Sequence, residues 1–255
     1  MPALRRVVHT VKIFLAGTDL LKNYPEEIAK AKYQLASFFN IQEWMIPILN
    51  KCEEYLLDSG AFSFMNGKKG EIDFDAYVDR YADFINKHKV KNFFELDVDC
   101  VIGQKKTYLL RDKLETLTGR QCIPVWHKSR GLEEWGKICE EYNYVAIGGI
   151  VSKEILPFQY KALPAMIDIA HKKGAKVHGL GFTSTSYFHK VKFDTVDSTT
   201  WNVGGKFGNV CVFSEKDYMK QRIQKKGKRC IDQKSLMIHN WNEWIKFQKY
   251  AEKYL

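Results

Sequence analysis

The stretch LLDSGAFSF, residues 56–64, interrupts an apolar run with an acid, a serine and a glycine before apolar residues resume. A strand buried on both faces has a nearly continuous apolar sequence, and Asp58 stands where such a strand would end. In parallel α/β folds the carboxyl ends of the strands face the ligand site. The stretch therefore predicts a buried strand that delivers a carboxylate to a cavity.

Seven other short apolar runs end as abruptly, most of them in Gly, Asp, His or Thr. They are VKIFLAGT, NFFELDVD, CIPVWHK, YVAIGG, KVHGLGFT, DTVDST and GNVCVFS. Stretches with helical spacing lie between the early runs, and the clearest follows the capping-type residue Asp73. Its apolar positions are Phe74, Tyr77, Val78, Tyr81, Phe84 and Ile85. Strands that alternate with helices predict parallel βαβ units.

Eight such steps predict an α/β fold of the (β/α)8 TIM-type barrel class, in which the strand ends line one shared mouth. The chain, 1–255, is expected to form a single domain with a basic C-terminal extension, 214–255. Short connections at 181–194 and 201–209 predict an irregular last third of the barrel. A doubly wound sheet is the alternative. The C-terminal helix is expected to pack on the barrel through Met237, Trp241, Trp244, Ile245 and Gln248.

Composition and charge limit the class of protein. A hydrophobic content of 45% with 27% charged residues is ordinary for a globular chain, and no apolar run approaches the roughly 20 residues that a membrane span needs. The basic residues and apolar stretch near the N-terminus are interpreted as the lead into a first strand, not as a signal peptide. Six cysteines without a CxxC or CxC pair indicate a reducing cytoplasm. The net charge of +10 makes nucleic acid the leading partner.

Carboxylates dominate the polar residues that end the runs. The expected mouth contains Asp58, Asp97, Asp99, His127, Gly148, Gly149, His178, Gly179, Gly181 and Asp197. Acids gathered in this way bind a metal, move a proton or attack carbon. A metal would be served best by His127 and His178 with an Asp, but no HxH or HxxxH pair exists, so no metal and no cofactor are expected.

Glycosyl transfer requires one carboxylate that attacks a sugar carbon and a second that handles the proton of the leaving group. Two strand-end aspartates on different strands could supply this pair. Glycines at the ends of two later runs would leave room for a flat aromatic substrate and would expose backbone N–H donors.

Four motifs resemble the tRNA-guanine transglycosylases and, more closely, their relatives in bacteriophages and bacteria that exchange guanine for a 7-deazaguanine in DNA, a modification associated with restriction evasion. These motifs are LDSGAF at 57–62, LDVD at 96–99, AIGGI at 146–150 and VDS at 196–198. The resemblance implies that Asp58 transfers protons and that Asp197 is the nucleophile. It also implies that Asp97 or Asp99 reads the guanine edge and that backbone amides near Gly149 meet the base.

Two departures favour the compact DNA-acting relatives. The tRNA enzymes carry a CxCxxC…H zinc site after the nucleophile, whereas only Cys211 and Cys230 stand in that region here. Val125-Trp126-His127-Lys128 replaces their GxVQGG segment, which puts His127 where a Gln would contact the base. The expected localisation is cytoplasmic, in the host if the chain is encoded by a phage.

Several candidate residues have structural alternatives. Asp194 lies three residues before Asp197, and because strand side chains alternate, it should face the helices as a cap or salt bridge. Asp97 and Asp99 share strand parity; Asp97 is preferred as the base reader, with Asp99 as its partner. His178 is expected to be packed or hydrogen-bonded. The further substrate-binding candidates are Ser59, Phe62, Gly148, Ile150 and Trp201, and Trp126 is a further stacking candidate; for the aromatic ones, core packing is an equal alternative.

The predicted activity is base exchange in DNA, with guanine replaced by a free 7-deazaguanine of the preQ0 type through a covalent Asp intermediate. Phosphate contacts are expected from Lys216, Lys220, Arg222, Lys225, Lys226, Lys228 and Arg229. The nearest alternative is the same reaction on tRNA. A metal-dependent barrel hydrolase and a non-catalytic nucleic-acid binder are the alternatives of other classes.

Overall fold

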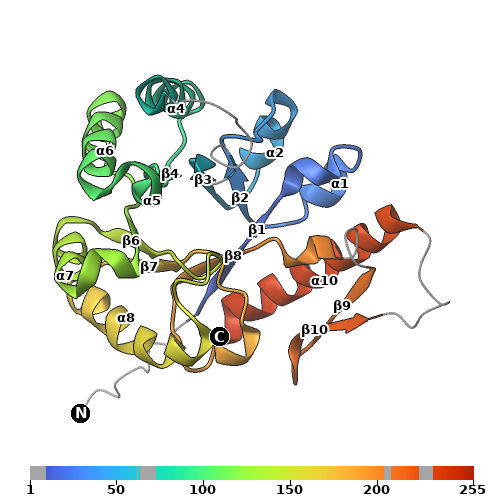
Figure 1. Ribbon diagram of the computed structural model, residues 1–255. Coiled ribbons are helices and arrows are strands. Elements are labelled where there is room, and N and C mark those ends of the chain that lie inside the picture. Colours follow the sequence, from blue (N-terminus) through green and yellow to red (C-terminus); the bar gives the residue numbers. More distant parts are fainter. Residues whose placement is uncertain (1–9, 62, 64–72, 204–207, 224–231) are drawn as a thin grey trace, which may run out of the picture.

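The computed structural model describes residues 10–61, 63, 73–203, 208–223 and 232–255. Figure 1 shows a curled sheet surrounded by helices, with a long C-terminal helix and a β-hairpin on one side. The stretch that opens the sequence analysis is the end of a strand, as predicted: β3 ends at Asp58.

Eight parallel strands form the main sheet, in the order β4-β3-β2-β1-β8-β7-β6-β5. Their bounds are β1 Lys12–Ala16, β2 Tyr33–Ser37, β3 Glu54–Asp58, β4 Asn92–Phe93, β5 Val125–Trp126, β6 Tyr144–Ile147, β7 Lys176–Gly179 and β8 Thr195–Ser198. The two edges, β4 and β5, are linked by a single parallel bridge between Phe94 and Ile123. Ile123 N donates to Phe93 O at 2.8 Å and Glu95 N donates to Ile123 O at 3.1 Å. The sheet is thus curled until its edges touch, without a full ladder between β4 and β5.

Helices connect most of the strands. The α-helices are α1 Pro25–Ile28, α2 Ile46–Leu49, α4 Phe74–His88, α5 Asp99–Ile102, α6 Gln104–Thr118, α7 Gly131–Glu141, α8 Leu163–Lys172 and α10 Gln233–Tyr254. The 3-10 turns are η1 Thr18–Leu21, η2 Glu43–Met45, η3 Lys128–Arg130, η4 Pro157–Ala162, η5 Thr185–Tyr187 and η6 Thr200–Asn202. The predicted cap is confirmed, because the Asp73 side chain accepts from Ala76 N.

Two of the sequence predictions about strands were wrong. GNVCVFS is not the eighth strand of the main sheet: it is β9, Asn209–Ser214, which pairs antiparallel with β10, Tyr218–Ile223. The strand missed is β2, whose sequence YQLAS carries a Gln in place of an apolar residue. Gln34 is buried, and its Nε2 donates to Ile28 O at 2.9 Å, which gives the NH2 group of the amide a partner.

Alternation along the strands divides the apolar residues between two layers. Inward-facing side chains form one cluster inside the curled sheet, which includes Phe14, Tyr33, Leu56, Phe94, Val125 and Ala146. The residues between them belong to two larger clusters beneath the helices. Side chains at i and i+2 of a strand point to the same face, so Asp58 on β3 points inward like Leu56. Asp197 on β8 lies beside the inward-facing Phe14 of β1 in the strand register and therefore also points inward. The interior of the curled sheet is therefore filled by apolar side chains, except at the carboxyl ends of the strands, where polar side chains face inward.

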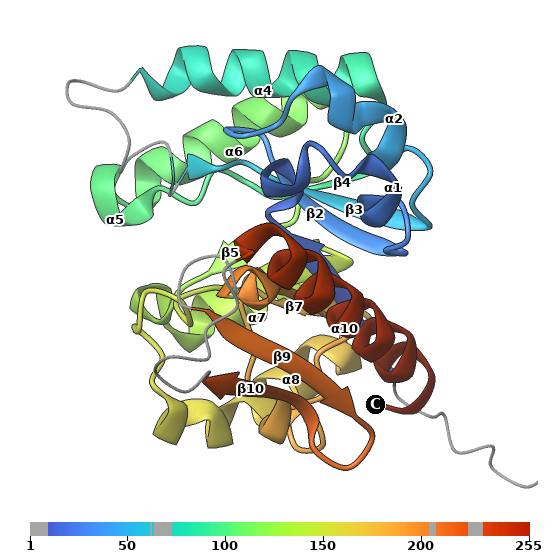
Figure 2. The same ribbon diagram turned by 90° about the vertical axis from the view of Figure 1, so that its right-hand side faces the viewer.

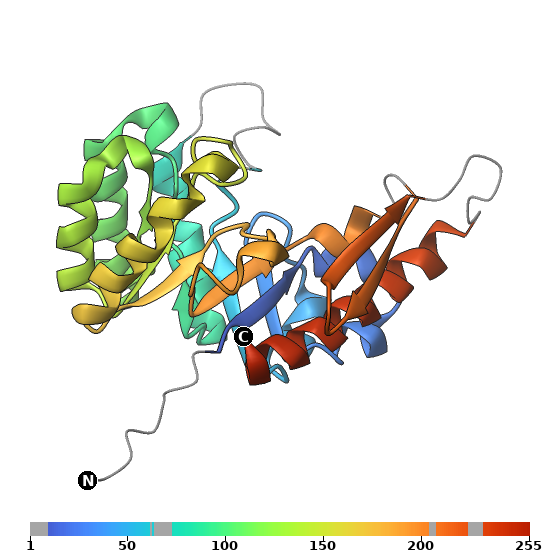
Figure 3. The ribbon, with the colours of Figure 1, turned by 90° about the horizontal axis from the view of Figure 1, so that it is seen from below.

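The last third is irregular, as predicted. The connection after β7 contains only η5, and β8 is followed by η6 and the hairpin before α10 begins. Figure 2 shows α10 and the hairpin β9–β10 side by side, and Figure 3 places them on the side of the molecule away from α7 and α8.

The helix α10 packs on the sheet through the predicted face, since Trp241, Trp244, Ile245 and Gln248 are buried. Gln248 Nε2 donates to the carbonyls of Ile13 and Tyr33, which ties this helix to β1 and β2.

Within the described parts of the chain, no helix has both the length and the apolar character needed to cross a membrane.

Candidate active site

A cavity of about 380 Å³ opens at the carboxyl ends of the strands. Among the described residues, its charged side chains are Asp19, Asp58, Asp97, His127, Glu154 and Asp197. Its volume lies in the range of small-molecule sites, roughly 300–1,000 Å³. Of the predicted site residues, the structure brings Asp58, Ser59, Asp97, His127, Gly149 and Asp197 to this cavity.

Asp58 is held at the end of β3 by a sharp turn. Its Oδ2 accepts from Gly60 N at 3.0 Å. Gly60 has φ +71°, and a Cβ at this position would lie 2.5 Å from Cβ of Phe39, so the turn requires glycine. Burial raises the pKa of Asp58 to about 7, and the charges of Asp197 and Asp97 act in the same direction against the Gly60 hydrogen bond. Such a carboxyl group can both donate and accept a proton near neutral pH.

Asp197 lies inside the sheet at the end of β8, 8% exposed. Its Oδ1 accepts from Gly181 N at 2.5 Å and from His178 Nε2 at 3.2 Å. Asp194 faces the other way: its Oδ2 accepts from Val177 N and lies 2.8 Å from His171 Nε2. The parity prediction is confirmed, because Asp197 lines the cavity and Asp194 lies on the helix side.

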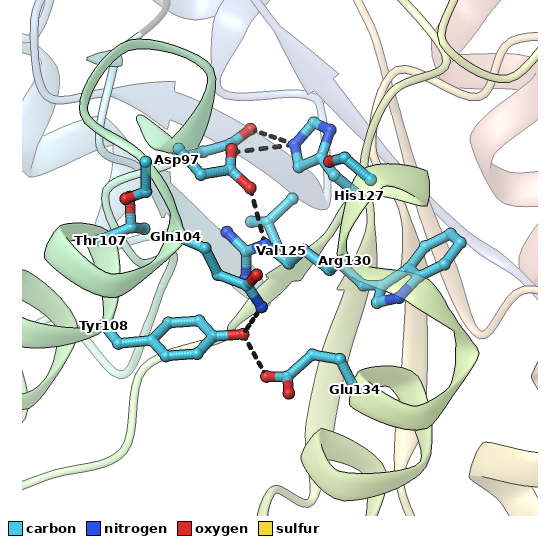
Figure 4. Close-up of polar contacts among 12 residues, drawn as sticks. Asp97, Gln104, Thr107, Tyr108, Val125, His127, Arg130 and Glu134 are labelled. Carbon is cyan, nitrogen blue, oxygen red and sulfur yellow. Dashed lines mark hydrogen bonds and ion pairs between the residues drawn. The ribbon is translucent and has the colours of Figure 1, made fainter.

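His127 is held between two carboxylates on the opposite wall. Its Nε2 lies 2.9 Å from Asp97 and its Nδ1 lies 2.7 Å from Glu154 Oε2; Figure 4 shows the ring pointing toward Asp97. Burial lowers the pKa of His127, but Asp97 and Glu154 outweigh it and raise the value to about 9. The ring is therefore an imidazolium at neutral pH, with both N–H groups directed at carboxylates.

Asp97 and Asp99 lie close together but have different partners, and the strand parity predicted for this pair was wrong. The strand β4 ends at Phe93 and Asp99 begins α5, so the two residues do not alternate along one strand. Asp99 Oδ2 accepts from Arg130 Nε at 2.8 Å. Arg130 also donates through Nη1 to the buried Glu95 at 3.0 Å. Asp97 is thus the acid that lines the cavity, and Asp99 belongs to a buried ion-pair network beside it.

Among the residues that the structure describes, one set of side chains has the spacing to hold a metal ion. Oxygen or nitrogen atoms of Asp97, Asp99 and His127 lie within 4.8 Å of one another. Each already has a protein partner, since Asp99 binds Arg130 and His127 lies between Asp97 and Glu154. A cation at this position would have to displace the imidazolium proton and lie close to a guanidinium. The set therefore fits a metal poorly unless these ion pairs rearrange.

Two of the aromatic candidates for stacking are corrected by burial. Trp201 is 0% exposed, its Nε1 donates to Ala16 O at 2.7 Å and its ring packs on Trp241. Trp126 is also buried, against Trp135. Both rings pack in the core, so neither can stack on a base. The Ile150 side chain belongs to the same core cluster, and the contact of its backbone amide with a base stays a prediction.

The predicted glycines differ in position. Gly149, with φ +79°, lines the cavity. Gly148 lies behind it, where a Cβ would come within 2.8 Å of the His127 ring; it makes room for the ring rather than for a ligand. Phe62 lies outside the described residues.

Two acids in the cavity were missed from the sequence. Asp19 directly follows the VKIFLAGT run, so the rule that identified Asp58 could have found it; burial raises its pKa. Glu154 lies in the loop after β6, where nothing distinguishes it from a solvated loop residue. Only the fold shows that it reaches His127.

The basic candidates lie on the hairpin. Lys216 is in the turn between β9 and β10, while Lys220 and Arg222 are on β10, with Lys220 paired to Asp217 at 2.7 Å. Outside the described residues lie Lys225, Lys226, Lys228 and Arg229.

The Arg222 end of the hairpin adjoins the mouth. In the ladder between β9 and β10, Arg222 pairs with Val210, and the next pair is Ile223 with Asn209. Asn240 Nδ2 donates to the carbonyls of Asn209 and Trp201. Because Trp201 is in η6, directly after β8, this end of the hairpin lies near the carboxyl ends of the strands.

The Lys216 end lies toward the opposite end of the sheet. Tyr218, next to the turn, packs on Phe247 and Tyr250 of α10. The last turn of this helix carries Glu252, which binds Lys32 at 2.9 Å, just before β2 begins. Arg222 is therefore the described basic residue of the hairpin that lies closest to the cavity.

No protein-family model matches the chain, and no curated protein matches it either.

Proposed function

We propose that this protein is a guanine transglycosylase that exchanges guanine in DNA for a free 7-deazaguanine, on a (β/α)8-type barrel. The observation that carries the proposal is the pairing of Asp58 and Asp197 across one cavity from β3 and β8. Asp58 has a pKa of about 7, and Asp197 has one carboxylate oxygen held by two hydrogen-bond donors. Double displacement at a sugar carbon needs this division of roles.

In the first half-reaction Asp197 Oδ2 attacks C1′ of the nucleotide from the face opposite the base. The C1′–N9 bond breaks, its electron pair goes to the purine, and protonated Asp58 supplies the proton that the departing guanine takes up. A glycosyl ester of Asp197 remains. Since a base inside a duplex cannot reach the cavity, the nucleotide must be flipped out or lie in a single strand.

In the second half-reaction the 7-deazaguanine occupies the emptied pocket. Asp58, now ionised, takes the N9 proton, and N9 attacks C1′ as the ester bond breaks and its electron pair returns to Asp197. Two inversions retain the configuration. Asp97 and the backbone near Gly149 orient either base, because the two bases differ only at position 7.

The charge of the site supports a nucleic acid held at the rim. The described lining of the cavity carries five acidic side chains and one basic side chain, His127. This excess of acids repels phosphate, whereas the chain as a whole has a net charge of +10. Phosphates are therefore bound outside the mouth, and the extruded base and sugar enter it. The absence of the zinc-site cysteines in the sequence favours DNA over tRNA, and cytoplasmic localisation follows from that role.

A metal-dependent hydrolase is a second candidate because Asp97, Asp99 and His127 could converge on an ion. That enzyme would purify with stoichiometric metal and lose activity with chelator. The proposed transglycosylase keeps its activity under chelation.

The decisive experiment incubates the protein with labelled guanine and either DNA or tRNA, and counts label in the polymer. Incorporation into DNA is the expected result. Asp197→Ala should abolish both incorporation and the covalent DNA adduct without unfolding the protein. Asp194→Asn is the matched control and should retain both. Normal turnover of Asp197→Ala, or the absence of label in both polymers with the unmodified protein, would reject the proposal.

A further inference from the structure

Resting on the proposed function, we infer that His178 is a positioning residue that makes Asp197 a good leaving group in the second half-reaction. Its Nε2 lies 3.2 Å from Asp197 Oδ1, and the side chain is 0% exposed. From the sequence, His178 is expected only to be packed or hydrogen-bonded. Its hydrogen-bond contact with the proposed nucleophile, Asp197, adds a role in the reaction.

The His178 ring is held in one orientation. It lies edge-on to the rings of Phe94 and Phe14, with centroids 5.2 and 6.3 Å away. Strand register places Thr195 beside it, and Nδ1 lies 2.8 Å from Thr195 Oγ1. The ring therefore has one nitrogen directed at Thr195 and the other at Asp197.

The nucleophilic form of Asp197 assigns the tautomer. An ionised carboxylate can only accept a hydrogen bond, so the contact between Asp197 Oδ1 and His178 Nε2 requires the ring proton on Nε2. In this tautomer Nδ1 accepts from Thr195 Oγ1, which also lies 2.6 Å from Tyr144 OH.

Two donors thus converge on Oδ1, which leaves Oδ2 as the attacking atom. The second donor is Gly181 N at 2.5 Å, in a left-handed conformation with φ +69° that brings it close to Val151. In the glycosyl ester Oδ1 is a carbonyl oxygen. When the C1′–O bond breaks, the electron pair returns to the carboxylate, and the charge that develops on Oδ1 meets both N–H groups. Hydrogen bonds to a charged acceptor are stronger than those to a neutral one, so His178 stabilises the released carboxylate more than the ester.

A consequence follows for the covalent intermediate. Removing the His178 donor should shift the equilibrium from free Asp197 toward the adduct. From the difference between charged and neutral hydrogen bonds, the shift should be roughly fivefold or more. A purely structural lesion would lower the amount of adduct, so the direction of the change separates the two roles.

The test equilibrates the full-length protein with a guanine-containing DNA strand and a fixed concentration of free guanine. The ratio of covalent adduct to free protein is read on a denaturing gel, and the decay of the adduct is followed after excess guanine is added. His178→Phe should raise the ratio about fivefold or more and slow the decay by a similar factor. His178→Gln, which keeps an N–H donor near the Nε2 position, should return both values toward those of the unmodified protein.

Two further variants complete the design. Thr195→Val removes the hydroxyl that donates to Nδ1 in this tautomer and should shift the ratio in the same direction as His178→Phe, which keeps the test open if the Phe variant fails to fold. His171→Phe breaks the His–Asp pair at Asp194, on the helix side, and should leave the ratio unchanged.

An unchanged or lowered ratio in folded His178→Phe, or no recovery with Gln, overturns the role of His178 while the exchange activity stands. Absence of both adduct and exchange in the unmodified protein rejects the proposed function, and the role of His178 with it.

Discussion

Asp58 and Asp197 stand on strands separated by β2 and β1 in the sheet, and both side chains line the same cavity. The charge of Asp197 contributes to raising the pKa of Asp58, so the two groups interact as well as share a space. Curvature of the sheet brings them face to face, because inward-facing residues on strands of a curled sheet point toward a common axis.

Asp58 should give the adduct-forming step its pH dependence. Because the pKa of Asp58 is raised to about 7, the acid form needed for guanine departure persists to that pH. The single-turnover rate should be flat below pH 7 and fall about tenfold per pH unit above it. Asp97→Asn removes one of the charges that raise this pKa, so the falling limb should move to lower pH. A rate that stays level to pH 9 would remove Asp58 from the role of acid.

Asp58→Asn should stabilise the protein while abolishing exchange. The folded-state pKa of about 7 exceeds the ordinary value near 4, so ionised Asp58 destabilises the folded state above pH 7. Each pKa unit corresponds to about 1.4 kcal/mol, which gives an upper limit of about 4 kcal/mol for the gain at pH 8. The gain should shrink as pH falls through 7 and vanish below pH 4, where both states are protonated. Denaturant unfolding at pH 4, 6 and 8 measures this dependence.

Glu154→Gln should lower the pKa of His127. Glu154 is one of three carboxylates, with Asp97 and Asp99, that raise this pKa to about 9, so its neutralisation should move the value toward the ordinary 6.5 or so. The KM for the free base should rise with little change in kcat, because the ring loses one of its two anchors. NMR titration of the imidazole nitrogens measures the first effect. Glu134→Gln, which alters a contact with Tyr108, is the control and should leave the titration of His127 unchanged.

The hairpin should show a graded contribution to nucleic-acid binding. Arg222, at the end near the mouth, should contact phosphate, and Arg222→Ala should reduce the slope of log affinity against log salt by about 0.7 to 0.9. Lys216→Ala changes the same charge at the far end and should leave the slope unchanged. Equal effects of the two substitutions would show that the polymer binds along the whole hairpin or does not approach it from the mouth.

Trp201 should act on stability and not on binding. Trp201→Phe removes the hydrogen bond to Ala16 O and part of the packing on Trp241, which should lower the free energy of unfolding by about 1–3 kcal/mol. Affinity for nucleic acid, measured well below the unfolding temperature, should stay the same. A tenfold loss of affinity in the folded variant would restore the stacking role that burial excludes.

The sequence identified most of the elements on which this site depends. Apolar runs ending in polar residues located seven strands of the main sheet, and the helical spacing after Asp73 located α4. It missed β2 because Gln34 interrupts the apolar pattern, and its burial depends on a partner carbonyl that no local pattern reveals. It took β9 for a strand of the main sheet because an apolar run does not state which strand it pairs with.

By itself the sequence determined where most of the strands lie, and because side chains alternate along a strand, it placed Asp194 and Asp197 on opposite faces. Only the tertiary structure decided which of these residues act together. Asp97 lines the cavity while Asp99 binds Arg130, because β4 stops early and Asp99 begins α5. Glu154 reaches His127, and His178 reaches Asp197, through hydrogen bonds between distant segments. Such contacts depend on the curvature and register of the whole sheet, which no short stretch of sequence encodes.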